Sequence, residues 1–184
     1  MQKTIEKNVI IVGTGIHLGR PARLTIKPAP TNHGIVFKRL DVDHNNTLIK
    51  ANFKNILSGE LCTTLVNEEG ISVKTVEHLL AAFSGLGISN ALIEIDNEEV
   101  PILDGSAKVF IEKIISTGIE VSNSPIKIIK INKEVKFSDG ERFISIKPST
   151  LSLDIDFEIK YKNKIIGCQR NKVKVYEDDL TDVY

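Results

Sequence analysis

The first part of the chain alternates apolar and polar residues over short runs, which is typical of strands joined by turns. Residues 9–12 form an apolar run, and Leu24 and Ile26 alternate with polar neighbours. Residues 35–37 follow an Asn-His-Gly turn signal. Residues 61–66 are rich in β-branched side chains and end at Asn-Glu-Glu-Gly, which predicts another strand.

After residue 74 the period changes from that of a strand to that of a helix. Five apolar residues recur with helical spacing and form one stripe: Val76, Leu79, Leu80, Phe83 and Leu86. Gly85 and Gly87 mark the end of this run. We therefore expect an amphipathic helix over residues 76–86, followed by a strand over residues 91–96.

A second helix is predicted after the sequence Asp104-Gly105-Ser106. Ser106 is a suitable N-cap and Gly118 a suitable C-terminal stop. The helix would bury a stripe made of Ala107, Phe110, Ile111 and Ile114. Asp104-Gly105-Ser106 is read as turn and cap chemistry and not as a hydrolase site, because neither GxSxG nor a triad partner is present.

The remainder of the chain is strand-like. Residues 121–125, Val-Ser-Asn-Ser-Pro, are the best candidate for a linker. Beyond them, apolar residues occupy every second position of residues 151–161, which predicts a strand with one buried and one solvated face. Asp178 and Asp179 resemble the first turn of a helix. The fold class is α+β: a two-layer domain of sheet and helices over residues 1–122, then an incomplete β-rich unit over residues 126–184.

Charge and composition exclude several classes of function. Lys+Arg and Asp+Glu both number 24, so the formal net charge is zero, and no block of like charge suits a nucleic acid. Aromatic residues make up 5% and Trp is absent, which disfavours base stacking. The apolar run at residues 9–12 is too short for a signal peptide or a transmembrane segment, so we expect a cytoplasmic protein.

The adjacent Glu77 and His78 are unusual within the apolar run TVEHLLAAF. On a helical projection His78 falls opposite the apolar stripe, on a face of small residues with Ala81 and Ala82. Burial of either polar group without a partner is costly, so the pair must face water, a salt bridge or a metal. An adjacent pair is a weaker metal signal than the histidines one turn apart in HExxH. The pattern alone leaves a solvated face and a metal site open.

Three motifs in order resemble the UDP-3-O-acyl-N-acetylglucosamine deacetylases. They are GTGIHLG at residues 13–19, LCTTLVNEEG at residues 61–70 and TVEHLLAAFSGLGISNALIEIDNEEVPILDGSA at residues 75–107. The likeness is dense over residues 9–112 and thins to a pattern of strands after residue 125. The resemblance implies the zinc-dependent, committed step of lipid A synthesis in a Gram-negative bacterium, with acylated UDP-N-acetylglucosamine as substrate.

This resemblance also implies two similar layered domains with the active site between them. His78 matches the first zinc ligand of the family and Glu77 its general base. Such a site has three protein ligands and a water, whose proton the carboxylate accepts. His17 matches a histidine near the active site, and Leu61, Cys62 and Thr63 match a strand that lines the substrate cleft. A turn histidine and ordinary core packing are the alternatives for these four residues.

The resemblance is incomplete in the C-terminal part. The family's other two zinc ligands, from a His-Lys-x-x-Asp motif, have no counterpart, because no histidine occurs in residues 79–184. The second catalytic histidine and the oxyanion-stabilising threonine are missing as well. We therefore expect a C-terminally truncated deacetylase that is inactive alone. A non-catalytic nucleotide-sugar-binding remnant and a split enzyme completed by another chain are the alternatives. The uncovered strand at residues 151–161 would favour self-association.

Overall fold

The computed structural model describes residues 1–57, 61–149 and 153–174. The chain divides into two compact units, Met1–Ile126 and Lys127–Tyr184. The first unit extends past residue 122, where the sequence analysis ended it. Strand β10 (Ile119–Val121) pairs with β1 (Lys3–Ile5), so Val121 belongs to a strand and not to a linker. The amide of Gln2 also donates to the carbonyl of Ser124, which holds the following residues against the N-terminus.

A five-stranded sheet forms one layer of the first unit. Its strand order is β2-β3-β9-β4-β5, and only the β4–β9 pair is parallel. In β2, Val9 and Ile11 are buried while Ile10 and Val12 are exposed, so the apolar run has one inner and one outer face. The strands are β2 (Val9–Thr14), β3 (Pro21–Lys27), β4 (Ile35–Arg39), β5 (Leu48–Lys50) and β9 (Ala91–Ile95).

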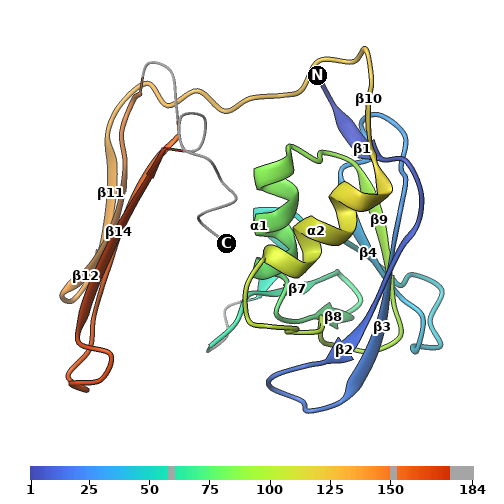
Figure 1. Ribbon diagram of the computed structural model, residues 1–184, viewed down its shortest axis with the longest axis horizontal. Coiled ribbons are helices and arrows are strands. Elements are labelled where there is room, and N and C mark those ends of the chain that lie inside the picture. The colour runs from blue at the N-terminus through green and yellow to red at the C-terminus, as the bar shows by residue number, and fades with distance from the viewer. Residues whose placement is uncertain (58–60, 150–152, 175–184) are drawn as a thin grey trace. The chain divides into compact units, whose positions relative to one another are not determined.

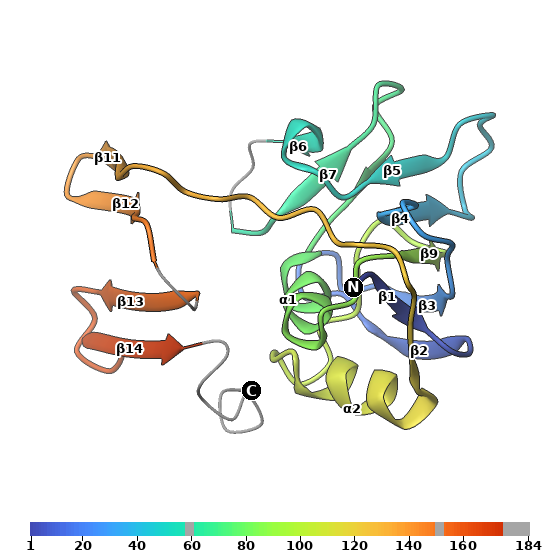
Figure 2. The ribbon, with the colours of Figure 1, turned by 90° about the horizontal axis from the view of Figure 1, so that it is seen from above.

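Helices α1 (Glu77–Leu86) and α2 (Lys108–Thr117) form the other layer and lie together over one face of the sheet (Figures 1 and 2). The predicted stripe of α2 is confirmed, because Phe110 and Ile114 are fully buried. In α1 the buried residues are Leu79, Ala82 and Phe83. Ala82 was expected on the face of His78, and this was wrong. The buried stripe follows i, i+3 and i+4 from Leu79, so it is centred farther round the helix.

A small three-stranded sheet lies beside this layer. It consists of β6 (Ile56–Leu57), β7 (Thr64–Val66) and β8 (Ser72–Val73), and a short 3-10 helix (Phe53–Asn55) precedes it. The predicted strand at residues 61–66 begins only at Thr64. Leu61 has a φ of 71°, which is incompatible with an extended strand. The turn predicted at the end of the strand is present, with Gly70 at a φ of 77°.

Two antiparallel hairpins make up the described part of the second unit. They are formed by β11 (Val135–Asp139) with β12 (Arg142–Ile146), and by β13 (Asp154–Lys160) with β14 (Cys168–Lys174). The predicted alternation is present in β13, but its apolar face is not buried: Ile155 is 45% exposed and Phe157 60% exposed. The start of that predicted strand at 151–152 and the helix turn predicted at residues 178–179 lie outside the described residues.

Within the described residues, one mixed sheet, several antiparallel sheets and the helices α1 and α2 confirm the α+β class. Among the residues that the structure describes, no helix has both the length and the apolar character needed to cross a membrane.

Candidate active site

Glu77 and His78 are the first two residues of α1. Val76 precedes the helix as its N-cap and makes no side-chain cap hydrogen bond. The unpaired amides of the first turn give this end a partial positive charge, which favours the carboxylate of Glu77. Both side chains are half-buried, so they are shielded from bulk water but remain accessible. The helix therefore presents a carboxylate and an imidazole side by side at its start.

Thr63 holds the Glu77 carboxylate through its backbone. The amide of Thr63 donates to Oε2 of Glu77 at 3.1 Å, and the carbonyl of Thr63 accepts from the amide of Val76 at 3.4 Å. These two bonds fix the segment before β7 against the start of α1. The Sγ of Cys62 lies 3.7 Å from Oγ1 of Thr64, and the side chain of Leu61 is 88% exposed. Of these three substrate-side candidates, only Thr63 contacts Glu77 by a hydrogen bond.

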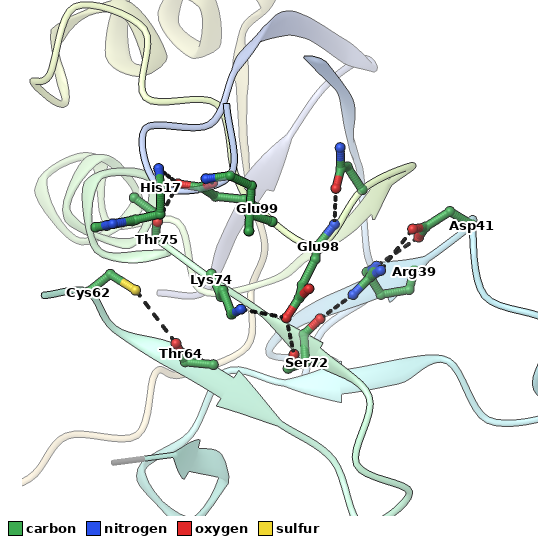
Figure 3. Close-up of polar contacts among 12 residues, drawn as sticks. His17, Arg39, Asp41, Cys62, Thr64, Ser72, Lys74, Thr75, Glu98 and Glu99 are labelled. Atoms are coloured by element: carbon green, nitrogen blue, oxygen red, sulfur yellow. Dashed lines mark hydrogen bonds and ion pairs between the residues drawn. The ribbon is translucent and has the colours of Figure 1, made fainter. Parts of the chain in front are cut away.

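A buried carboxylate, Glu99, connects the loop of His17 with the residue that leads into α1 (Figure 3). Its side chain accepts hydrogen bonds from the amide of His17 at 2.9 Å, the amide of Leu18 at 2.7 Å and Oγ1 of Thr75 at 3.0 Å. Burial raises the pKa of Glu99, but these three bonds outweigh it and hold the pKa below its ordinary value. Glu99 is therefore ionised at neutral pH.

The glycines of GTGIHLG allow this close approach. A Cβ on Gly15 would lie 2.2 Å from Oε2 of Glu99, and a Cβ on Gly13 would lie 2.9 Å from Cβ of Pro101. Either contact is shorter than real atoms tolerate. The tight backbone that the sequence predicted around His17 is confirmed. Glycine is needed there because a side chain at residue 13 or 15 would clash with residues 99–101. The imidazole of His17 itself is exposed.

A second polar cluster holds the strand-like segment before Thr75. Lys74 pairs with Glu98 at 2.9 Å, and Oγ of Ser72 donates to the same carboxylate at 2.8 Å. Burial raises the pKa of Glu98, but the bonds from Lys74 and Ser72 leave it below its ordinary value. Arg39 donates to the carbonyl of Ser72 and binds Asp41 through two nitrogens, which lowers the pKa of Asp41 (Figure 3). This cluster connects the end of β4 in the main sheet to β8 of the small sheet.

The sequence Asp104-Gly105-Ser106 forms a turn as predicted, but the N-cap position of α2 is Ala107 and not Ser106. The hydroxyl of Ser106 donates to Oδ1 of Asp104 at 3.0 Å and accepts from the amide of Lys108 at 3.1 Å. The backbone amide of Ser106 also donates to Asp104, which lowers the pKa of that carboxyl. Both side chains are therefore engaged in local structure at the start of α2.

Sequence reasoning missed Glu99 and Thr75. Glu99 is 1% exposed, and it stands in the polar run Asn97-Glu98-Glu99, which looks like an ordinary solvated turn. A signal for it was the apolar sequence Val-Pro-Ile that follows immediately. Thr75 has a φ of 57°, which is rare for a β-branched residue. Its residue type therefore gives no indication of this conformation.

Comparison with known proteins agrees with the sequence motifs around this site. Residues 2–183 match the family model described as LpxC, UDP-3-O-acyl N-acetylglycosamine deacetylase. The chain is 39% identical over 174 residues to the UDP-3-O-acyl-N-acetylglucosamine deacetylase of Shewanella violacea, covering 95% of this chain and 56% of that protein. It is 41% identical over 165 residues to the enzyme of the same name from Colwellia psychrerythraea, covering 90% and 53%.

A third relative of this name, from Pseudoalteromonas atlantica, is 40% identical over 169 residues, which are 92% of this chain and 55% of that protein. The chain thus spans about half the length of the curated relatives that it matches. The matched region includes GTGIHLG, LCTTLV and TVEHLLAAF, the motifs that the structure brings together around the start of α1. The chain belongs to the UDP-3-O-acyl N-acetylglycosamine deacetylase family.

Proposed function

We propose that this chain supplies the Glu77–His78 part of a zinc-dependent site that removes the N-acetyl group from UDP-3-O-acyl-N-acetylglucosamine. The observation that carries this proposal is the pair itself. A carboxylate and an imidazole begin one helix, and the backbone amide of Thr63 holds Oε2 of Glu77. This placement, in a chain of the deacetylase family, suits a general base next to a metal ligand.

The metal would need ligands beyond this pair. A catalytic zinc takes three protein ligands and keeps a fourth position for water. Residues 1–57, 61–149 and 153–174 contain no group of three His, Cys, Asp or Glu side chains that could hold a metal. His78 is thus one ligand of an incomplete set. We therefore expect the 184-residue chain alone to bind zinc weakly and to hydrolyse no substrate.

The residues of this chain have separate roles in the proposal. Glu77 accepts a proton from the attacking water, and the Thr63 amide orients the carboxylate by holding one of its oxygens. His78 contributes an imidazole ligand. His17, in the exposed loop before β3, approaches the substrate, together with the segment Leu61-Cys62-Thr63. The complete ligand set would hold a zinc ion, whose chemistry would be to polarise the acetamide carbonyl and to make water more acidic.

The test is to join this chain to the second half of a related deacetylase and to assay release of acetate from the acylated UDP-sugar. Glu77→Ala should lower turnover by roughly 10²–10⁴-fold with the metal retained, as expected for loss of a general base. His78→Ala should lower both turnover and zinc content, measured by elemental analysis. Glu112→Ala and His44→Ala, at exposed positions, are the matched controls and should change neither.

Two results would contradict the proposal. A chimera that hydrolyses the substrate at the same rate with Glu77→Ala and His78→Ala would remove the pair from the reaction. Tight one-to-one zinc binding by the 184-residue chain itself would reveal ligands other than those named above. A chimera that binds the UDP-sugar without hydrolysing it would favour the alternative, a nucleotide-sugar-binding remnant.

A further inference from the structure

The Glu99 carboxylate is the most buried charge near the proposed site, and the reaction described above does not use it. Glu99 is 1% exposed, and its side chain accepts from two consecutive amides of the GIHLG loop and from one side chain, Thr75. Its neighbour Glu98 has a different environment, because it pairs with the partly exposed Lys74. The two carboxylates therefore stabilise different parts of the chain.

The loop is shaped to receive this carboxylate. A Cβ on Gly15 would lie 2.2 Å from Oε2, 2.5 Å from Cδ and 2.9 Å from Cγ of Glu99. The amide of Gly15 bonds the carbonyl of Arg20 and the amide of Gly19 bonds the carbonyl of Gly15, which closes the loop on itself. With its base closed in this way, the loop directs the amides of His17 and Leu18 at the carboxylate.

Thr75 receives the other side of the same carboxylate. Its backbone has a φ of 57°, and its side chain is 2% exposed. A β-branched residue is found in this conformation only where its surroundings hold it there. The hydroxyl of Thr75 donates to Oε1, the same oxygen that accepts from the His17 amide. Because Thr75 lies two residues before Glu77, its backbone sets the direction in which the chain enters α1.

The segment that carries Glu99 is held parallel to the residues that lead into α1. The amide of Lys74 donates to the carbonyl of Glu98 at 2.8 Å, and the amide of Val100 donates to the carbonyl of Lys74 at 3.1 Å. Residues 74 and 99 thus form a parallel β-bridge. This bridge places the Glu99 side chain within reach of both the His17 loop and Thr75.

We propose that Glu99 is a positioning residue: its carboxylate fixes the His17 loop and the entry into α1 relative to each other. The role of Glu77 and His78 in hydrolysis rests on the function proposed above, whereas the coupling of the two segments does not. Glu99 touches neither of these side chains through a described hydrogen bond, so it acts through Thr75 and through the backbone of the loop.

Glu99→Gln is the direct test, because it keeps the shape of the side chain. Wherever the amide nitrogen of Gln lies, it faces a backbone N–H of His17 or Leu18, so one of these donors loses its acceptor. Loss of a hydrogen bond to a charged group changes an opening equilibrium by roughly 10- to 100-fold. We expect amide hydrogen exchange at His17 or Leu18 in the 184-residue chain to accelerate by that factor.

Coupling between the His17 loop and the start of α1 predicts a second change, which the same amide spectra would show. The backbone resonances of residues 75–78 should shift in Glu99→Gln, although none of the altered loop amides belongs to that segment. Glu98→Gln is the matched control and should leave the exchange of His17 and Leu18 unchanged. Accelerated loop exchange with unchanged resonances at residues 75–78 would overturn the proposal, as would equal effects of Glu98→Gln.

Thr75→Val provides a second route in case Glu99→Gln does not fold. Valine keeps the branched shape and removes only the hydroxyl, so the resonances of the His17 and Leu18 amides should shift although the loop is untouched. In the double variant this effect should vanish, because the carboxylate that transmits it is gone. Unchanged loop amides in Thr75→Val would overturn the proposal. None of these measurements needs zinc or substrate, so their failure is distinguishable from failure of the proposed hydrolysis.

Discussion

Gly15→Ala should be one of the most destabilising single substitutions of a surface loop in this chain. The new Cβ would lie 2.2 Å from Oε2 of Glu99, so the carboxylate must move. Its movement breaks bonds from His17, Leu18 and Thr75. Overpacking costs about 1–3 kcal/mol and each lost bond to a charged group about 1.5–3 kcal/mol, so loss of even one of these bonds predicts about 2.5–6 kcal/mol.

Gly19→Ala is the matched control, because Gly19 has a φ of 63° and a Cβ there would meet nothing within 4 Å. Its cost should be that of a left-handed backbone alone, about 1–2 kcal/mol. The assay is denaturant-dependent hydrogen exchange of amides in β3 and β9. Fluorescence would not report on this unit, because Trp is absent and the three tyrosines lie after residue 126. A Gly15→Ala cost no larger than that of Gly19→Ala would refute the reasoning.

Three further substitutions test the fold. Phe110→Ala should cost the first unit about 3–5 kcal/mol in the same exchange assay, because Phe110 is fully buried. Ser106→Ala should cost about 0.5–2 kcal/mol through loss of the bond to the Lys108 amide, with Ser116→Ala as control. Bonds from Arg170 lower the pKa of Asp156 to about 2 from an ordinary 3.8. Its stabilisation of β13–β14 should therefore be complete above about pH 3.8 and be lost as the pH falls towards 2. Asp156→Asn should abolish this pH dependence in an NMR titration.

Much of the first unit was predictable from hydrophobic periodicity. The stripe of α2 depends on local spacing and is confirmed by burial, and the apolar run at residues 9–12 is confirmed as part of strand β2. The pairing of β1 with β10 was missed, because these three-residue strands are joined by partners more than one hundred residues apart, such as Lys3 and Val121. The early start predicted for β7 failed for a different reason: the left-handed backbone of Leu61 is not encoded in its side-chain type.

The candidate site was predictable only where polar residues interrupted an apolar pattern. Glu77 and His78 were singled out because a polar pair within an apolar helical run requires an explanation, and their roles stay a prediction. Glu99 was missed because its role depends on His17, which lies 82 residues away in the sequence, and on Thr75. A single buried carboxylate surrounded by donors looks, in sequence, the same as a solvated one.

In the described part of the second unit, hairpin β13–β14 leaves the apolar side chains of one face exposed, and this limits its stability. In β13–β14 the charged residues Asp156, Glu158 and Arg170 pair on one face, whereas Ile155 and Phe157 on the other remain 45% and 60% exposed. Full burial of such side chains would contribute about 1.5–3 kcal/mol each, and a lone hairpin is marginal in water.

We therefore expect β13–β14 amides to exchange through local opening while those of β3 and β9 exchange slowly. Where protection of the hairpin rises with protein concentration, self-association through the apolar face is the expected cause. Phe157→Ser should then weaken association in sedimentation experiments without altering exchange in residues 1–126. Strong protection of both units in a dilute monomer would show that the described hairpins are stable without any cover over Ile155 and Phe157.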